Sequence, residues 1–397
     1  MPHYRNRFLT RLIKETLSYS PIVGIFGHRQ VGKTTMAERL SKSYQTLDRR
    51  DILEQVMVNP ESFLEQQENI PFAIDECQLA PPLFPVLKDW VRRHPKPGQF
   101  LLTGSVRFSS RKAIRESLTG RLIAWELIPM DFAEIHSLSL SDAIPRILKS
   151  SSLELELKER HIFSERDVDL YLTQGGLPGI FTVRNSAIRI QKIETQLNTI
   201  LERDLKLIIE TSLSYRTLKN LLSALALRQN QPLEWAGLSR QTRISVPTLK
   251  KLIAAFESIF ILRIISTEGT DKKPVIFFED QGEASYLAEN RYDLLTNRIR
   301  FLFANLRAQI LYRPELGIRM FQYRNRGGGY VPLCFGKGNS FLGIIPILED
   351  RPSLSEIRGA QSFIKTYQKA KIIYCHIGKT DYLIQKNIRC CSMGKLL

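Results

Sequence analysis

A glycine-rich segment carries the clearest chemistry in this sequence. It reads G-x-x-x-x-G-K-T and lies between an apolar run and an amphipathic stretch. Its two glycines let the backbone turn tightly, so that successive N–H groups point inward at phosphate oxygens. The lysine adds a mobile positive charge for the β- and γ-phosphates, and the following hydroxyl suits the ligand shell of Mg²⁺. The residues predicted to bind the nucleotide are Gly27, His28, Arg29, Gln30, Val31, Gly32, Lys33, Thr34 and Thr35.

Two adjacent carboxylates, Asp75 and Glu76, close an apolar run further along the chain. Neighbouring residues at a strand end point in different directions, so one pair can serve two roles. We expect Asp75 to hold Mg²⁺ together with Thr34, and Glu76 to orient the water that attacks the γ-phosphate. An ordinary solvated strand end is the alternative, but the upstream phosphate-binding loop favours the functional interpretation.

Two further polar side chains are candidates for contact with the γ-phosphate. The run FLLTGS ends in small hydroxyl residues, and Thr103 or Ser105 would lie beside the γ-phosphate if this strand lies between the other two. Arg121 follows a Thr-Gly turn and could neutralise transition-state charge, in its own subunit or in a neighbour's. A surface ion pair explains Arg121 equally well. The predicted catalytic residues are therefore Glu76, Thr103 and Arg121.

The elements that must position these side chains follow from the hydrophobic pattern. Up to residue 136, short apolar runs alternate with amphipathic stretches, which is typical of a parallel sheet covered by helices on both faces. Strands are predicted at 21–26, 44–48, 70–76, 98–105 and 121–129, with helices after the phosphate-binding loop and over 82–94. The sequence thus predicts an α/β P-loop NTPase fold for this part of the chain.

Beyond this part, the pattern becomes mainly helical and then rich in strands. The turn QGGLPGI at 174–180 opens the helical region. Residues 233–265 then have the rhythm helix, turn, helix, strand, with Ser245 as the expected N-cap of the second helix. That outline is typical of a winged helix, although it could also be a module that only packs against its neighbours. An α+β domain is predicted after it.

The charge of the chain is concentrated near its end. The net charge is +17 over 397 residues, and residues 281–397 hold 18 basic against 8 acidic side chains, an excess of +10. Such a surface would attract DNA or an acidic protein, and a generally basic surface is the simpler explanation. No run of about 18 apolar residues is present to span a membrane, and the cysteines have no metal-type spacing. These features favour a cytoplasmic protein with reduced thiols.

Residues 1–136 resemble the ATPase domain of a prokaryotic AAA-type family of P-loop proteins. The shared motifs are G-x-R-Q-V-G-K-T-T at 27–35, L-D at 47–48, I-D-E-x-Q at 74–78, L-T-G-S at 102–105, L-x-G-R at 118–121, L-x-P at 127–129 and F-x-E at 132–134. The resemblance implies ATP, in preference to GTP, and Mg²⁺ as cofactors. It extends to a G-G-x-P turn at 175–178 and an R-D pair at Arg203–Asp204.

Proteins of that family carry a C-terminal domain similar to restriction nucleases, with an E-V-D strand and a later E-V-K strand. Here Tyr330-Val331-Pro332 replaces E-V-D, and the later strand GIIPILED has no E-V-K. A metal nuclease needs clustered carboxylates and a lysine, so we expect a binding domain instead. The predicted domains are an AAA-type ATPase at 1–136, a helical linker at 137–210, a winged-helix-like domain at 211–280 and a basic, nuclease-like but inactive domain at 281–397.

The leading hypothesis is a Mg²⁺-dependent ATPase that couples ATP hydrolysis to a conformational change in its C-terminal part, which binds nucleic acid or a protein partner. The alternative is an ATP-binding regulatory switch, or a DNA-binding protein, with little or no turnover. Formation of a homo-oligomer is left open, and it decides whether Arg121 acts in its own subunit or in a neighbour.

Replacing Lys33 with alanine is expected to abolish tight ATP binding, because the β- and γ-phosphates lose their main counter-charge. Calorimetric titration of the parent and the variant with ATP measures this loss. Equal affinities in the two proteins would show that the loop is not a nucleotide site.

Overall fold

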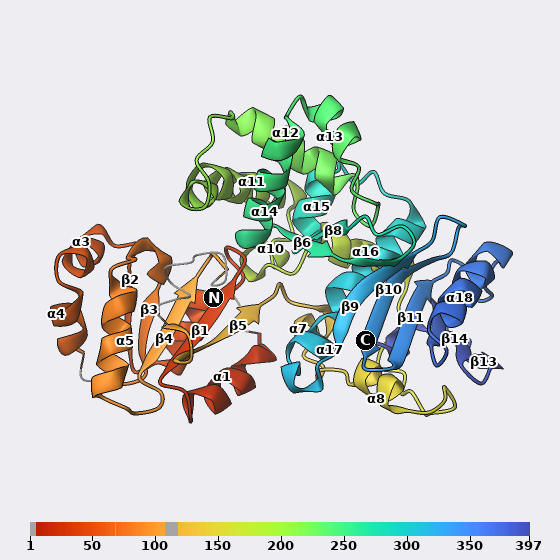
Figure 1. Cartoon of the computed structure of the whole chain (residues 1–397), viewed down its shortest axis with the longest axis horizontal. Helices are drawn as coiled ribbons and strands as arrows, with labels where there is room; N and C mark the ends of the chain where they lie inside the picture. Colours follow the sequence, from red (N-terminus) through yellow and green to blue (C-terminus); the bar gives the residue numbers. More distant parts are fainter. Residues whose placement is uncertain (1–4, 68, 108–117) are drawn as a thin grey trace.

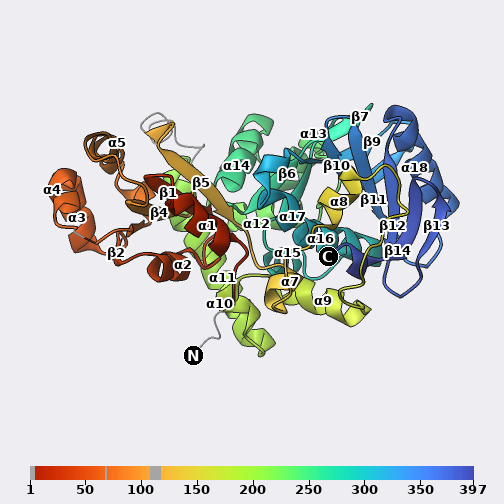
Figure 2. The same ribbon diagram turned by 90° about the horizontal axis from the view of Figure 1, so that it is seen from below.

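The computed structural model describes residues 5–67, 69–107 and 118–397. Figure 1 shows a parallel sheet with its helices at the N-terminal end, a group of helices beside it, and a larger sheet at the C-terminal end. Figure 2 shows the same three parts from below, with α11 and α12 between the two sheets. The predicted order of an α/β unit, a helical region and an α+β region is confirmed.

The N-terminal sheet has five parallel strands in the order β2-β3-β4-β1-β5. Their bounds are Ile22–Gly27 for β1, Ser43–Thr46 for β2, Phe72–Asp75 for β3, Phe100–Gly104 for β4 and Leu122–Leu127 for β5. The three central strands are buried along their whole length, as expected for apolar runs covered on both faces. The five predicted strands are therefore confirmed.

Helices cover both faces of this sheet. Their bounds are Leu9–Leu17 for α1, Lys33–Leu40 for α2, Arg50–Val58 for α3, Pro60–Glu65 for α4 and Leu83–Arg93 for α5. Side chains of α1 and α2 share one apolar cluster with alternate residues of β1, such as Val23 and Ile25. Those of α4 and α5 share another with Ile22 and Phe26. The alternation along β1 therefore divides its side chains between two cores.

The middle part of the chain is mainly helical and includes a two-stranded antiparallel sheet near its end. Its elements are α9 (Glu165–Gln174), α10 (Pro178–Phe181), α11 (Ser186–Thr199), the π-helical turn η3 (Ile200–Asp204), η4 (Leu205–Leu207), α12 (Tyr215–Ala226), α13 (Trp235–Thr242), α14 (Val246–Ser258), β6 (Leu262–Ile265), β8 (Val275–Phe278) and α15 (Gln281–Leu287). Ser245 caps α14 by accepting a hydrogen bond from the N–H of Thr248, as predicted. The order of α12, α13, α14 and the β6–β8 pair suits a winged helix, and that assignment stays a prediction.

The C-terminal part is built on a seven-stranded mixed sheet with the order β13-β14-β12-β11-β10-β9-β7. The strands are β7 (Thr267–Gly269), β9 (Arg319–Arg324), β10 (Tyr330–Lys337), β11 (Ser340–Pro346), β12 (Lys371–His376), β13 (Tyr382–Gln385) and β14 (Ile388–Ser392). The helices α8 (Ala143–Lys149) and α16 (Leu294–Leu306) pack on one face, and α18 (Leu354–Thr366) packs on the other.

Two contacts cross the predicted domain boundaries. The helix α8, from the predicted linker at 137–210, packs against β10 and β11. The strand β7, from the predicted winged-helix segment at 211–280, pairs in parallel with β9. The division at residues 136, 210 and 280 therefore stays a prediction: the strands of the C-terminal sheet come from the last two segments, and the covering helix α8 comes from the segment 137–210.

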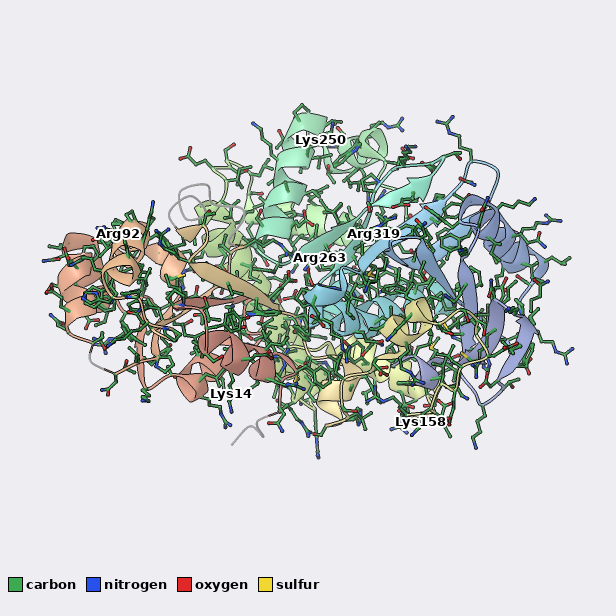
Figure 3. All side chains as sticks on the ribbon, turned by 60° about the horizontal axis from the view of Figure 1, so that its bottom comes forward. Lys14, Arg92, Lys158, Lys250, Arg263 and Arg319 are labelled. Carbon is green, nitrogen blue, oxygen red and sulfur yellow. The ribbon has the colours of Figure 1, made fainter. Side chains whose placement is uncertain are left out.

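A largely buried cluster of three arginines and two glutamates, centred on the fully buried Glu279, joins the three parts of the molecule. Glu279 accepts hydrogen bonds from Arg307 at 2.6 Å, Arg263 at 2.9 Å and Arg107 at 3.2 Å, and Glu126 on β5 contacts the same three arginines. Figure 3 shows Arg263 in the middle of the molecule. Burial alone would raise the pKa of Glu279, but the three guanidinium groups lower it to about 2.

Within the part of the chain that the structure describes, no helix combines the length and hydropathy needed to cross a membrane. The same residues contain no group of three or more His, Cys, Asp and Glu side chains arranged to hold a metal ion. The five cysteines are buried and have free thiols.

Candidate functional site

The predicted site residues meet at the carboxyl edge of the parallel sheet. Because all five strands run in the same direction, their last residues share one edge. The strand β4 lies between β3 and β1, and its Thr103 is paired with Ile25, two residues before the phosphate-binding loop. Thr103 therefore lies on a strand between the other two, as its predicted position beside the γ-phosphate requires.

The phosphate-binding loop has the tight backbone that its sequence predicts. Gly32 has a φ of +103°, and Gln30 has a φ of +60°. A Cβ atom on Gly27 would lie 2.3 Å from the carbonyl oxygen of Leu127, so the close approach of β5 requires glycine there. The Nζ of Lys33 donates to the carbonyl oxygens of Gly27 at 3.0 Å and His28 at 2.9 Å. Burial lowers the pKa of Lys33, against the opposing charges of Glu76 and Asp75.

Asp75 gathers three hydroxyl groups. Its Oδ2 accepts hydrogen bonds from Thr34 and from Tyr44, each at 2.8 Å. Its Oδ1 accepts from Thr103. A carboxylate beside a threonine hydroxyl offers the hard oxygen ligands that Mg²⁺ prefers, with its other positions left to water and phosphate. The residues present thus fit the predicted magnesium site.

Glu76 points in a different direction from Asp75. Its backbone is in the left-handed region, with φ at +54°, which is uncommon for a residue with a side chain and costs conformational energy. Its carboxylate accepts a hydrogen bond from the amide of Gln78, and the hydroxyl of Ser105 lies 3.4 Å away. This turn places Glu76 in the wall of the cavity described next.

A cavity of about 500 Å³ opens at this edge of the sheet, a size in the usual range for small-molecule sites. The loop and α2 form its floor, and Asp75 and Glu76 lie at one side. Its remaining walls come from separate segments and include Arg5, Arg7, Asp48, Met130, Pro178, Gly179 and Thr182. Residues far outside the phosphate-binding loop therefore close the site.

His28 does not turn its side chain towards this cavity. Its Nε2 lies 3.0 Å from Oε2 of Glu283 on α15, and both side chains are fully buried. Its Nδ1 lies 2.7 Å from the carbonyl oxygen of Arg29. The prediction that His28 binds nucleotide is thus corrected for its side chain, which instead joins the loop to the helical region.

Arg29 and Asp48, which line the cavity, are each paired with one member of the R-D pair. Nη1 of Arg29 lies 3.3 Å and 3.4 Å from the two carboxylate oxygens of Asp204. Arg203 forms an ion pair with Asp48, which follows β2. The R-D pair of the helical region therefore contacts the nucleotide-binding unit directly.

Arg121 lies at the wrong edge of the sheet to act within its own subunit. It precedes β5, whose first residue, Leu122, is paired with Ile22 at the start of β1, whereas Gly27 at the loop is paired with Leu127. In a parallel pair the two ends of a strand lie on opposite edges, so the prediction of a role in its own subunit is wrong. A role for Arg121 in a neighbouring subunit stays a prediction.

Arg7 holds the phosphate-binding loop from behind. Its guanidinium donates to the carbonyl oxygens of Val31 at 2.7 Å and Ile128 at 2.5 Å, and to Glu134 at 2.9 Å. Glu134 also accepts from the N–H of Phe8 at 2.6 Å. The glutamate of the F-x-E motif thus anchors an arginine that fixes the loop.

The two glycines of the G-G-x-P turn have no room for a side chain. A Cβ atom on Gly175 would lie 2.3 Å from Oδ1 of Asp280, and one on Gly176 would lie 2.2 Å from the carbonyl oxygen of Met130. The N–H of Gly176 donates to Asp280 at 2.7 Å. This close packing brings Pro178 and the residues after it to the cavity wall.

Sequence reasoning missed three residues that shape the site. Tyr44 reaches Asp75 from the neighbouring strand, while Arg7 and Glu283 hold the loop through contacts between segments distant in sequence. None of them lies in a recognisable pattern. The R-D pair was visible as a motif, but nothing in its local sequence indicated its partners.

The stability of the protein is expected to fall as the pH rises from 6.5 to 9. Burial alone would lower the pKa of His28, but Glu283 raises it from 6.5 to about 9. The protonated form therefore stabilises the fold fully below pH 6.5 and is lost through pH 9, a change of about 3 kcal/mol. Burial and the charge of Glu134 also raise the pKa of Asp131 to about 8, so this carboxyl adds a loss of stability of the same sign within the window. Urea unfolding across the window measures the change.

The variant His28→Gln is expected to lose the part of this pH dependence that comes from the His28–Glu283 pair and to keep the part that comes from Asp131. His94→Gln, at an exposed histidine, is the matched control and should retain it. A parent protein with constant unfolding free energy between pH 6.5 and 9 would show that the His28–Glu283 pair is not charged.

Two segments of the chain match known family models. Residues 19–136 match an AAA domain, and residues 165–293 match a domain of unknown function, DUF8612. Uncharacterized proteins of Mycobacterium tuberculosis, Rv2008c, and Mycobacterium bovis, Mb2031c, are each 25% identical over 279 residues, covering 68% of this chain. The match covers 56% of each relative, so the chain spans a little over half the length of these proteins.

Among solved structures, a Signal Transduction ATPase with Numerous Domains protein from Pyrococcus horikoshii is 14% identical, with a TM-score of 0.27, and covers 76% of this chain and 46% of its own. AMPPCP-bound DnaA from Aquifex aeolicus is 16% identical, with a TM-score of 0.29. The match covers 64% of this chain and 88% of the DnaA chain. The family match and the geometry at the sheet edge agree on the first unit: residues 19–136 form an AAA-type P-loop domain.

Proposed function

We propose that this protein binds ATP with Mg²⁺ and hydrolyses it to ADP and phosphate. The observation that carries this proposal is the hydrogen bond between Thr34 and Asp75, made where the phosphate-binding loop meets the end of β3. Glu76 lies next to that pair in the cavity wall. The match of residues 19–136 to an AAA domain supports the same activity.

Each residue has a defined role in this reaction. The loop N–H groups and Lys33 bind the phosphates, and Thr34 and Asp75 would hold Mg²⁺, which supplies charge neutralisation at the β- and γ-phosphates. Glu76 orients the attacking water and accepts its proton as the new P–O bond forms and the bond to the leaving ADP oxygen breaks. Thr103 positions Asp75, while Gln78 and Ser105 position Glu76.

A direct route couples this site to the helical region. Two residues beyond Ser105, the N–H of Arg107 donates to the carbonyl oxygen of Ser258 at 2.8 Å, and its Nε donates to that of Glu257 at 2.8 Å. Its guanidinium also lies 4.3 Å from the centre of the Phe260 ring. The strand that carries Thr103 therefore ends on the C-terminus of α14, so a change at the γ-phosphate can move that helix.

Replacing Glu76 with glutamine is expected to keep ATP and Mg²⁺ bound and to slow hydrolysis by about 10²-fold, because the water loses its proton acceptor. Single-turnover phosphate release and ATP titration measure the two effects separately. Glu38→Gln, on the exposed face of α2, is the matched control and should hydrolyse ATP like the parent.

Two outcomes would change the assignment of roles. If Glu76→Gln hydrolyses ATP at the parental rate, water activation belongs to another residue. If the parent binds ATP without measurable turnover, the protein is a nucleotide-binding switch. Asp75→Asn should instead raise the Mg²⁺ concentration needed for activity.

A second proposed function is binding of nucleic acid by α13 and α14. The residues Arg240, Arg243, Lys250 and Lys251 are all exposed around the turn between these helices. Figure 3 shows Lys250 at the periphery of the molecule, away from the buried arginine cluster. A row of exposed cations on a helix and its preceding turn suits contact with a phosphate backbone. It gives no argument for reading base sequence, because α14 offers few side chains suited to base edges beyond its lysines.

Binding of duplex DNA is expected to weaken steeply with salt, with a slope of about −0.9 in log K against log salt for each phosphate contact. The variant Lys250→Glu/Lys251→Glu should bind more weakly and with a smaller slope. Lys14→Glu/Lys88→Glu makes the same charge change at exposed sites on α1 and α5 and should retain binding. Titrations at two ionic strengths measure this. Equal binding by both double variants would leave an acidic protein as the better partner.

A further inference from the structure

Two ion pairs of opposite polarity join the AAA domain to the segment at the end of α11. Arg29 of the phosphate-binding loop pairs with Asp204, and Asp48 pairs with Arg203. Arg29 and Asp48 both line the cavity. The segment η3 thus contacts residues of the cavity wall through two side chains. The acidic Asp204 pairs with Arg29, and the basic Arg203 pairs with Asp48.

Asp204 lies behind the cavity wall, where it contacts Arg29, a residue that lines the cavity. It is buried, with 2% of its surface exposed. Burial raises its pKa, the charge of Arg29 lowers it, and the charge of Glu76 raises it again. The positive charge of Lys33 also lowers the pKa of Asp204. Glu76 and Lys33 are the groups expected to face the γ-phosphate, and the Asp204 carboxylate is linked to that part of the site by its contact with Arg29 of the phosphate-binding loop.

A carboxylate at that place conflicts with a bound triphosphate. Two anions in a buried site repel each other more strongly than in water. They also compete for one cation, because Arg29 is a residue of the loop that would surround the phosphates. The Arg29–Asp204 contacts, at 3.3 Å and 3.4 Å, are longer than the 2.7–2.9 Å usual for charge-assisted hydrogen bonds. A phosphate oxygen can therefore replace Asp204 as the partner of Arg29.

We propose that the Arg29–Asp204 pair distinguishes ATP from ADP: the γ-phosphate takes Arg29 from Asp204 and releases η3 from the phosphate-binding loop, whereas ADP leaves the pair intact. This inference rests on the proposed function. It makes Arg29 and Asp204 residues that determine nucleotide specificity, and it gives the R-D pair a role at the site.

The second ion pair keeps the released segment near the site. Arg203 and Asp48 have 40% and 42% of their side-chain surface exposed, so their pair lies at the rim and not inside the cavity. Water screens such a pair, and a phosphate inside the cavity competes with it less. Loss of the Asp204 contact therefore loosens one side of η3 while the other side stays attached.

Asp204→Asn tests the inference by removing the competing charge without changing the shape of the side chain. With Mg²⁺ present, ATP affinity measured by calorimetry is expected to increase about tenfold relative to the parent, the effect of one lost like-charge repulsion. ADP affinity is expected to stay unchanged. The control is Glu194→Gln. Glu194 lies on α11, is paired with Lys219 of α12 and does not line the cavity, so this variant should change neither affinity.

Hydrogen exchange on the parent protein gives a second test that needs no variant. Residues 196–207 should exchange faster with the non-hydrolysable analogue AMPPCP bound than with ADP bound. An unchanged ratio of ATP to ADP affinity in Asp204→Asn would overturn the inference, as would equal exchange in the two complexes. A slower hydrolysis rate with the parental affinity ratio would overturn it too, by assigning Asp204 to catalysis. A parent that binds neither nucleotide would refute the proposed function itself.

Discussion

The geometry of the phosphate-binding loop depends on charges buried behind it. Arg7, held by Glu134, binds the carbonyl oxygen of Val31, and His28 is paired with Glu283. Removing one member of such a pair leaves an uncompensated buried charge, which typically costs 3–5 kcal/mol. The loop backbone is therefore set by the N-terminal segment on one side and by α15 on the other. A nucleotide would meet a loop whose shape is already fixed by contacts outside the loop itself.

The sequence predicted the parts of the site that local patterns encode, but not these buried pairs. The parallel strands were predictable because each is an apolar run, and a known motif ordered them around the loop. That order was sufficient to place Asp75 beside Thr34 and Thr103. Contacts between segments distant in sequence were not predictable, since no local pattern encodes them. Arg121 shows the limit: its motif singled it out as a candidate, but the pairing of β5 with β1 reveals that it lies at the edge of the sheet opposite the loop.

The centre of the molecule joins the site to the regions that would respond to it. The cluster of Arg107, Arg263 and Arg307 with Glu126 and Glu279 contacts β4, β5, β6 and α16 or their flanking residues. Because Arg107 follows the strand of Thr103 and donates hydrogen bonds to Glu257 and Ser258, the cluster connects the Thr103 side of the site to the end of α14. Buried charge networks have directional contacts, so they tolerate sliding between elements less readily than apolar surfaces do.

The largest apolar core has a consequence for attempts to divide this chain into fragments. It contains Val23 and Val31 from the AAA domain together with Leu197, Leu201 and Phe278 from the DUF8612 segment. A fragment ending at residue 136 would expose those side chains to water and leave Glu126 without its arginines from later in the chain. Exposed apolar surface of this kind promotes aggregation. The two matched segments are thus expected to unfold as one cooperative unit, although family models describe them separately.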